Sequence, residues 1–332
     1  MGCCINRLAV HFPDNILTND ELSTLFPEWS SAGIFDKIGV IERRYVSENE
    51  TAVDLAIAAG EKVLKDFDRS LVDFVILCTQ SPDYLLPTSA CIIQDKLNLD
   101  TKTGALDINL GCSGFIYGLG LSKGLIKAGL SKNVLLIMSE TYTKHIHPQD
   151  KGNRSIFGDA AAATIISECE TDKILEFALG TDGKGMNNLI IPNGGSRKQF
   201  DPAQTELQDD SGNIRNNNCL YMNGPEIFDF TIERIPQLVN ETLEKNRLTL
   251  ESVDYVIFHQ ANKYMLDYLR KKLKIPAEKF YLDIQNTGNT VSATIPIALK
   301  DALEKNLIKK GDKVLLAGFG VGYSWGAVVI EI

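Results

Sequence analysis

The stretch "VDFVILCTQ" at residues 72–80 returns as "VDYVIFHQA" at residues 253–261. In both copies an aspartate precedes a short apolar run, which is typical of a strand buried on both faces of a sheet. Two further pairs repeat in the same order, namely "LDIN" at 106–109 with "LDIQ" at 282–285, and "NVLLIM" at 133–138 with "KVLLAG" at 313–318. The copies stand about 180 residues apart, which predicts a duplicated unit of about half the chain.

The segments around these strands predict an α/β fold. An amphipathic helix precedes the repeated strand in each copy, at 51–67 and at 227–246, where Pro236 is expected to bend the helix. Strands and helices then alternate, and the helix at 115–130 is expected to be buried nearly all round. We therefore expect two similar α/β halves packed in layers, with helices between and outside the sheets. The polar stretch 193–220 is expected to be a long surface loop.

Composition narrows the class of protein. The chain has 332 residues, of which 44% are hydrophobic and 23% charged, as in ordinary soluble globular proteins. No apolar run approaches the roughly 20 residues of a membrane helix, so no membrane span is expected. The N-terminus "MGCCINRLAV" does not resemble a signal peptide. The net charge of −9 argues against nucleic acid as a partner.

The cysteines and histidines indicate a reducing setting and no metal. There are seven cysteines, an odd number, and their spacing matches neither a disulfide framework nor a metal site. We therefore expect a cytoplasmic protein. His145 and His147 are two apart, but no carboxylate or thiol cluster completes a zinc site, so we interpret them as loop residues.

One cysteine stands at a position that suits catalysis. Cys112, in "NLGCSGF", lies where an apolar strand runs through small residues into a helix. A small buried residue filling a tight corner is one interpretation. The other is a nucleophile whose thiolate is stabilised by the N-terminus of the helix.

Three more candidates follow strands of the second half. His259 ends a strand in "YVIFHQAN", Asn289 lies in a Gly-rich turn, and "GFGVG" at 318–322 ends the last long strand. Each has an ordinary structural interpretation: a hydrogen-bonded histidine, a turn-forming asparagine and a tight glycine turn. Ligand sites of α/β proteins lie at the carboxyl ends of strands. The coincidence of all four features at such ends favours one shared site.

The order of these motifs resembles the thiolase superfamily and, within it, the β-ketoacyl-acyl-carrier-protein synthase III family. The resemblance rests on "NLGCSGF", "HQAN", "NTGNTVSA" and "GFGVGYSWG", and also covers "LLPTSA", "IFGDAAAA" and "MNGPEIF". It implies a thiolase-like fold of two duplicated α/β halves in a layered αβαβα architecture. The expected halves are residues 1–172, with the cysteine, and 173–332, with the histidine and the asparagine.

The resemblance also implies a reaction. Cys112 would accept an acyl group from acyl-CoA, and the acyl-enzyme would condense with malonyl-acyl-carrier-protein in a decarboxylative Claisen reaction that starts fatty-acid synthesis. His259 and Asn289 would donate hydrogen bonds to the enolate, and the backbone N–H groups of Cys112 and Val321 would form the oxyanion hole. No cofactor is implied beyond these substrates.

More peripheral roles follow from the same resemblance. The implied CoA-binding residues are Trp29, Lys37, Lys151 and Asn262. The implied acyl-pocket residues are Phe319 and Leu86, of which Leu86 would reach the neighbouring subunit of a homodimer. The implied carrier-protein surface is Arg270, Lys271 and Lys272. The chain departs from the family at Val321, where glycine is usual, at Lys37 and Lys151, where arginine is common, and at Asp229, where a basic residue is common.

Other functions remain open at this point. A family member of a specialised pathway could condense a different acyl group, or pass it from Cys112 to an alcohol or an amine. A degradative thiolase would need a second catalytic cysteine near the C-terminus, whereas the last cysteine is Cys219. A non-enzymatic acyl-binding protein would not require Cys112, His259 and Asn289 together. A nucleotide-binding module lacks a phosphate loop of the required form.

Overall fold

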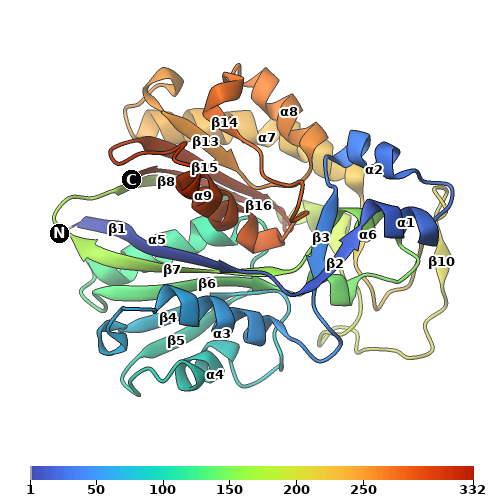
Figure 1. Ribbon diagram of the computed structural model, residues 1–332, viewed down its shortest axis with the longest axis horizontal. Coiled ribbons are helices and arrows are strands. Elements are labelled where there is room, and N and C mark those ends of the chain that lie inside the picture. The colour runs from blue at the N-terminus through green and yellow to red at the C-terminus, as the bar shows by residue number, and fades with distance from the viewer. Residues whose placement is uncertain (1) are drawn as a thin grey trace.

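Two five-stranded sheets organise the computed structural model, which describes residues 2–332 (Figure 1). The first sheet has the order β1 (Gly2–His11), β7 (Ala160–Cys169), β6 (Asn133–Glu140), β4 (Phe74–Cys78) and β5 (Gly104–Ile108). The second has the order β8 (Ile174–Thr181), β16 (Ser324–Glu331), β15 (Lys313–Gly320), β13 (Tyr255–Phe258) and β14 (Phe280–Tyr281).

The two sheets match strand for strand, which confirms the predicted duplication. β4 and β13 are the repeated strands, and each lies second from the edge of its sheet. β4 pairs in parallel with β5 and β6, just as β13 pairs in parallel with β14 and β15. The return strands β7 and β16 are antiparallel to β6 and β15. The carboxyl ends of β4, β5 and β6 therefore correspond to those of β13, β14 and β15.

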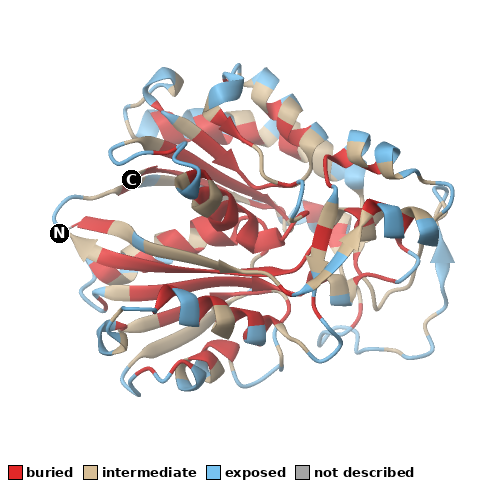
Figure 2. Ribbon diagram, viewed as in Figure 1, coloured by how far each residue is buried: buried red, intermediate tan, exposed pale blue. Residues whose placement is uncertain are grey.

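Helices fill the expected layers. α5 (Gly114–Lys127) and α9 (Thr294–Glu304) lie between the sheets, α3 (Ala52–Val63) and α4 (Ser89–Lys96) cover the first sheet, and α7 (Gly224–Lys245) and α8 (Lys263–Lys272) cover the second (Figure 1). The central core joins both sheets through residues such as Ile76, Phe115 and Leu316, each 0% exposed. Figure 2 shows this buried centre in red. The predicted αβαβα layering is confirmed.

Two local predictions were wrong in detail. The helix predicted at 51–67 ends at Val63. α7 contains Pro236 within its length, and the bend expected at Pro236 stays a prediction. α5 is buried in its N-terminal half, but Leu121 is 46% exposed and Lys123 pairs with Asp172. The C-terminal turns of α5 therefore expose one side to solvent while Ile126 stays in the core at 1% exposed, and the helix is not buried all round.

A smaller group of elements lies beside the strand ends. It contains β2 (Asn15–Thr18), α1 (Asn19–Leu25), α2 (Ser31–Ile38), β3 (Glu42–Tyr45) and α6 (Lys151–Ile156) (Figure 1). Short 3₁₀ turns complete the chain: η1 (Arg69–Leu71), η2 (Tyr142–His145), η3 (Gly183–Asn188), η4 (Leu250–Ser252), η5 (Ala277–Lys279) and η6 (Val291–Ala293).

The stretch 193–220 is not only a loop. It holds a short hairpin of β10 (Leu207–Gln208) and β11 (Ile214–Arg215), and it is flanked by the paired strands β9 (Leu189–Ile190) and β12 (Tyr221–Met222). The hairpin packs on the start of α6, where Gly152 N–H donates to Asn213 Oδ1 at 3.0 Å. Strands of two residues carry too few side chains to show an alternating pattern, which is why the sequence did not predict them.

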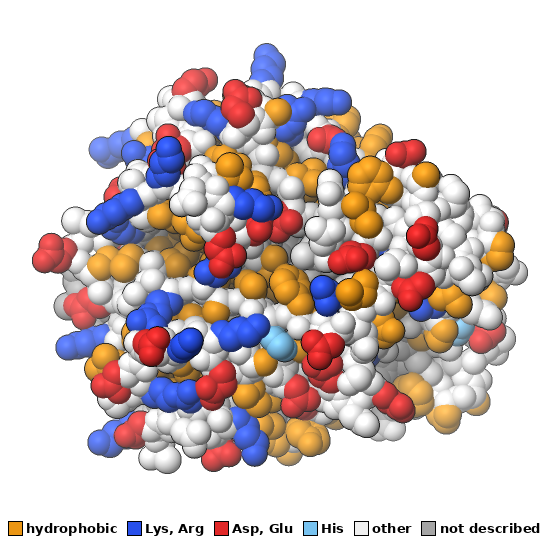
Figure 3. All heavy atoms as spheres, in the orientation of Figure 1, with side chains coloured by type: hydrophobic (Ala, Val, Ile, Leu, Met, Phe, Trp, Pro, Cys, Tyr) orange, Lys and Arg blue, Asp and Glu red, His pale blue; other side chains and the backbone are white. Residues whose placement is uncertain are grey.

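The surface has no dominant sign of charge on the face shown in Figure 3, where basic and acidic side chains are interspersed. None of the helices within residues 2–332 is long and apolar enough to span a membrane.

Candidate active site

A cavity of about 130 Å³ lies at the carboxyl ends of the strands and is lined by Cys112, His259 and Asn289. These three residues come from different loops and from both halves of the chain. The structure thus brings together the three side chains that the sequence singled out. The other lining residues come from the α6–β7 connection, α7, α8 and the end of β15, and include Phe157, Ile227, Met265 and Phe319.

Cys112 lies between β5 and α5, at the N-terminus of the helix as predicted, and is 6% exposed. Burial raises the pKa of its thiol to about 12, whereas hydrogen bonds from the backbone N–H groups of Val321 and of Cys112 itself lower it. The two N–H groups predicted to form an oxyanion hole therefore both lie at the sulfur. Because the effect of burial exceeds that of these hydrogen bonds, the thiol is neutral at physiological pH, and the helix N-terminus alone does not produce a thiolate.

The glycine-rich turn after β15 allows the second half to approach Cys112 closely. A methyl group on Gly320 would lie 2.8 Å from Cys112 Sγ, and one on Gly318 would lie 2.6 Å from the carbonyl oxygen of Cys112. Only glycine fits both positions without a shift of the backbone. Phe319, between them, is 2% exposed and lines the cavity.

His259 follows β13, and its backbone N–H donates to Ala317 of the neighbouring strand β15 at 2.8 Å. The ring Nδ1 lies 2.7 Å from Thr294 Oγ1, which leaves Nε2 for the cavity. Burial lowers the pKa of His259 to about 3, so the imidazole is neutral at physiological pH.

Asn289 is held by the α6–β7 connection. It forms a parallel bridge with Phe157, and its backbone N–H donates to Ile156 at 2.8 Å. Its Oδ1 accepts the N–H of Val291 at 2.9 Å, so the amide Nδ2 is left as a donor for the cavity. The preceding Gly288 has φ 64°, a left-handed conformation that favours glycine.

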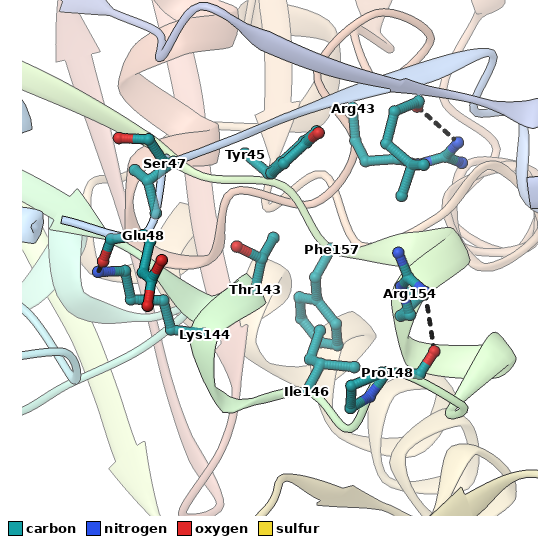
Figure 4. Close-up of a pocket in the computed structure, with 12 residues that line it drawn as sticks. Arg43, Tyr45, Ser47, Glu48, Thr143, Lys144, Ile146, Pro148, Arg154 and Phe157 are labelled. Carbon is teal, nitrogen blue, oxygen red and sulfur yellow. Dashed lines mark hydrogen bonds between the residues drawn. The ribbon is translucent and has the colours of Figure 1, made fainter. Parts of the chain in front are cut away.

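Phe157 and Tyr142 were not predicted as site residues, although Phe157 belongs to the quoted motif "IFGDAAAA". Their rings lie 5.3 Å apart and both line the cavity. Phe157 also borders a second pocket of about 520 Å³, which Figure 4 shows with Ile146, Tyr45 and Arg154 around it. Phe157 therefore lines both the small catalytic cavity and the larger pocket.

A third pocket, of about 320 Å³, contains Trp29 and Lys37 and shares Ile156 with the catalytic cavity. The ammonium groups of Lys37 and Lys151 lie 5.7 Å and 5.6 Å from the centre of the Trp29 ring. Lys151 also pairs with Glu28 at 2.6 Å, and its side chain is only 8% exposed. Three of the four predicted CoA-binding residues thus cluster here, but Lys151 is already occupied by a carboxylate.

The remaining predicted residues lie around the cavity or apart from it. Asn262 lines the cavity and is also the N-cap of α8, accepting the N–H of Met265 at 2.9 Å. Arg270, Lys271 and Lys272 are at the far end of α8, where Arg270 donates to Ile275 and Lys272 to Ile232. Leu86 is 82% exposed and does not line the cavity of its own chain.

Within residues 2–332 no group of three or more His, Cys, Asp or Glu side chains is placed to hold a metal ion.

Comparison with known proteins identifies the family. Two family models match, the 3-oxoacyl-(acyl-carrier-protein) synthase III model over residues 106–183 and its C-terminal model over residues 243–332. β-Ketoacyl-(acyl-carrier-protein) synthase III of Fusobacterium nucleatum is 37% identical over 331 residues, which cover 98% of each chain. The enzyme of the same name from Clostridium perfringens is 39% identical over 327 residues, covering 98% of this chain and 97% of that one.

The chain belongs to the 3-oxoacyl-(acyl-carrier-protein) synthase III family.

Solved structures agree with this assignment. The chain is 44% identical to a 3-oxoacyl-(acyl-carrier-protein) synthase III of known crystal structure. The two structures superpose with a TM-score of 0.98, and the match covers 100% of both chains. The priming β-ketosynthase of the R1128 polyketide pathway is 25% identical with a TM-score of 0.88, and the match covers 100% of this chain and 96% of that one. The solved structures similar to this chain therefore include enzymes named for different pathways, and the predicted family and thiolase-like fold are both confirmed.

Proposed function

We propose that this synthase III transfers an acyl group from acyl-CoA to Cys112 and condenses it with malonyl-acyl-carrier-protein. The observation that carries the proposal is the convergence of Cys112, His259 and Asn289 on one small cavity at the junction of the two halves. The halves are proposed to divide after residue 172, between β7, which ends at Cys169, and β8, which begins at Ile174.

In the first half-reaction, the Cys112 thiol must lose its proton as it attacks. Neutral His259 can accept that proton at Nε2, because Thr294 Oγ1 accepts a hydrogen bond from Nδ1–H. A new C–S bond to Cys112 forms, the thioester bond of the donor breaks, and the CoA thiolate takes the proton. The backbone N–H groups of Cys112 and Val321 stabilise the tetrahedral oxyanion. The Val321 side chain, where glycine is usual, does not remove this donor.

In the second half-reaction, malonyl-acyl-carrier-protein loses CO₂ and leaves a thioester enolate. Asn289 Nδ2 donates to the enolate oxygen. His259 donates to the same oxygen in its other neutral tautomer, which forms when Nδ1 releases its proton to water and Nε2 takes one up. In that tautomer the Thr294 hydroxyl donates to Nδ1 instead of to the carbonyl oxygen of Val291. The enolate carbon attacks the acyl carbonyl, the C–S bond to Cys112 breaks, and the cysteine sulfur takes up a proton. No metal or redox cofactor enters either step.

The pocket around Trp29 and Lys37 is the proposed entrance for the CoA part of the donor, next to Asn262. Lys151 takes part only when it leaves Glu28. We propose a homodimer in the cytoplasm, in which Leu86 of each chain approaches the acyl pocket of the other, near Phe319. Arg270, Lys271 and Lys272 are the proposed docking surface for an acidic carrier protein.

A second function stays a candidate because of two observations. Asp229 stands where a basic residue is common, and the R1128 priming ketosynthase has a similar structure. A specialised synthase III would pass the acyl group from Cys112 to another acceptor or condense it with another carrier.

Intact-protein mass spectrometry with a panel of acyl-CoAs tests the proposal, with Cys112→Ala as the control. We expect an acyl adduct on the wild type alone, discharged by malonyl-acyl-carrier-protein with formation of a β-ketoacyl product. An adduct that the malonyl carrier does not discharge would favour the second function. Absence of an adduct from every donor would contradict a catalytic role for Cys112.

A further inference from the structure

Glu140 is a fully buried carboxyl group that the proposed mechanism does not use. It is the last residue of β6 and is 0% exposed. A buried charge is costly unless it is paired and hydrogen-bonded. The groups around Glu140 therefore determine whether its carboxyl group is neutral or ionised.

The carboxyl group of Glu140 connects three loops around the cavity. Its Oε2 accepts the backbone N–H of Gln80 at 3.0 Å and the hydroxyl of Ser81 at 3.4 Å, both after β4. Its Oε1 lies 3.0 Å from Ser292 Oγ, in the turn that follows Asn289. Glu140 thus joins strand ends of the first half to the Asn289 turn of the second half.

The side chain of Gln80 extends this connection toward Cys112. Its Nε2 donates to Asn109 Oδ1 at 3.2 Å, in the loop between β5 and Cys112. Its Oε1 accepts the hydroxyl of Tyr142, which lines the cavity, at 2.7 Å. The loop before Cys112 and the Asn289 turn are therefore linked through Glu140 by hydrogen bonds.

The titratable groups that face Glu140 give its ionised form no cationic partner. They are Cys78, Cys112, Tyr142 and Asp159, all of which are neutral or anionic. His145 approaches through Ser81 at 3.2 Å, but burial lowers its pKa and keeps the ring neutral. Burial likewise raises the pKa of Glu140 to about 8. A neutral carboxyl group still accepts from Gln80 and Ser81 at Oε2. The Ser292 hydroxyl, which donates to Oε1 in the structure, then turns so that Ser292 Oγ accepts the O–H of the acid.

We propose that Glu140 is a positioning residue that, as a neutral carboxylic acid, holds the Cys112 corner against the Asn289 turn. This inference rests on the proposed function. When Glu140 ionises, a negative charge lies beside Cys112. That charge disfavours the thiolate, the oxyanion and the enolate, so the alkaline form of the enzyme condenses more slowly.

Glu140→Gln tests the proposal because an amide keeps the shape and the hydrogen bonds but does not ionise. Condensation is measured from pH 6 to pH 10 for wild type and variant. At pH 7 the variant should retain most of the activity. Above pH 8 the ratio of variant to wild-type activity should rise by up to about tenfold per pH unit, since only neutral Glu140 supports the reaction. A ratio that stays constant over this range would overturn the proposal.

Alkylation of Cys112 by iodoacetamide gives a readout that does not depend on the acyl reaction. Peptide mass spectrometry distinguishes Cys112 from the exposed Cys91. Above pH 8 Cys112 of the Glu140→Gln variant should react several-fold faster than that of the wild type, because no neighbouring anion raises its pKa. Equal rates would contradict the proposal even if the wild type proved unable to take up an acyl group.

Two further variants separate positioning from folding. Asp159→Asn changes the neighbouring buried acid, whose contacts run to Thr143 and Val46, and should keep the alkaline decline. Glu140→Ala removes the contacts to Gln80 and Ser292 and should lower condensation at every pH. Recovery of that activity in Glu140→Gln is expected, and a glutamine variant as slow as the alanine variant would contradict the neutral role.

Discussion

At the scale of single residues, the hydrogen bonds of Asn289 determine which atom of its side chain is available to the substrate. Asn289 uses Oδ1 on the Val291 N–H, so its free donor is Nδ2. Asn289→Ala should slow condensation by about 10²–10³-fold, the usual cost of removing one oxyanion donor, and should leave acylation of Cys112 within a few-fold of wild type. Asn286→Ala, an exposed asparagine of the same turn, is the control. Comparable loss in both half-reactions would count against a role in the enolate step.

Phe157 carries a second residue-scale prediction, on acyl-chain length. It lines both the cavity of about 130 Å³ and the pocket of about 520 Å³. Phe157→Leu, which removes part of the ring, should increase acylation by octanoyl-CoA relative to acetyl-CoA several-fold, because the two spaces become continuous. Phe115→Leu, in the core between the sheets, controls for general loosening of the interior. An unchanged preference in competition assays read by mass spectrometry would show that Phe157 does not limit the chain.

At the scale of elements, the glycines at the end of β15 allow this strand to lie close to Cys112. A methyl group on Gly320 meets Cys112 Sγ at 2.8 Å, and the end of β15 and the loop before α5 are too rigidly packed to separate freely. Gly320→Ala should therefore lower Cys112 acylation at least tenfold while far-UV circular dichroism stays unchanged. Gly183→Ala, where an added methyl group meets nothing within 4 Å, should be silent. Full acylation of the Gly320 variant would mean that the turn shifts readily.

What the sequence could predict also differs by element. Repeated apolar strands such as β4 and β13 were predictable, because burial on both faces leaves a continuous apolar run. Cys112 follows β5, His259 follows β13 and Asn289 follows β14, and these strand ends indicated the three residues. Glu140 and Phe157 were not predictable as site residues, because their importance comes from contacts between loops distant in sequence. The pairing of Lys151 with Glu28 has the same cause, since α6 and the residues before α2 meet only in the fold.

At the scale of the whole molecule, one part of the surface has the features of a contact with a second copy of the chain. Leu85 and Leu86 are 92% and 82% exposed, and they lie in the loop that leads from β4 to α4. β5 is the edge strand of the first sheet, and its outer side has no partner strand within residues 2–332. An open sheet edge and adjacent exposed leucines are the features that protein interfaces cover.

Leu86→Asp should therefore weaken the proposed dimer, because it would place a charge in an apolar contact between the two chains. The mass in solution, measured by light scattering after gel filtration, should fall from that of two chains toward one as the protein is diluted. Leu130→Asp, which changes a leucine that is 69% exposed after α5, should leave the dimer intact. Loss of Cys112 acylation together with the dimer would indicate that the loop completes the neighbouring site. A dimer as tight as wild type would place the interface elsewhere, and β5 would then be the next edge to test.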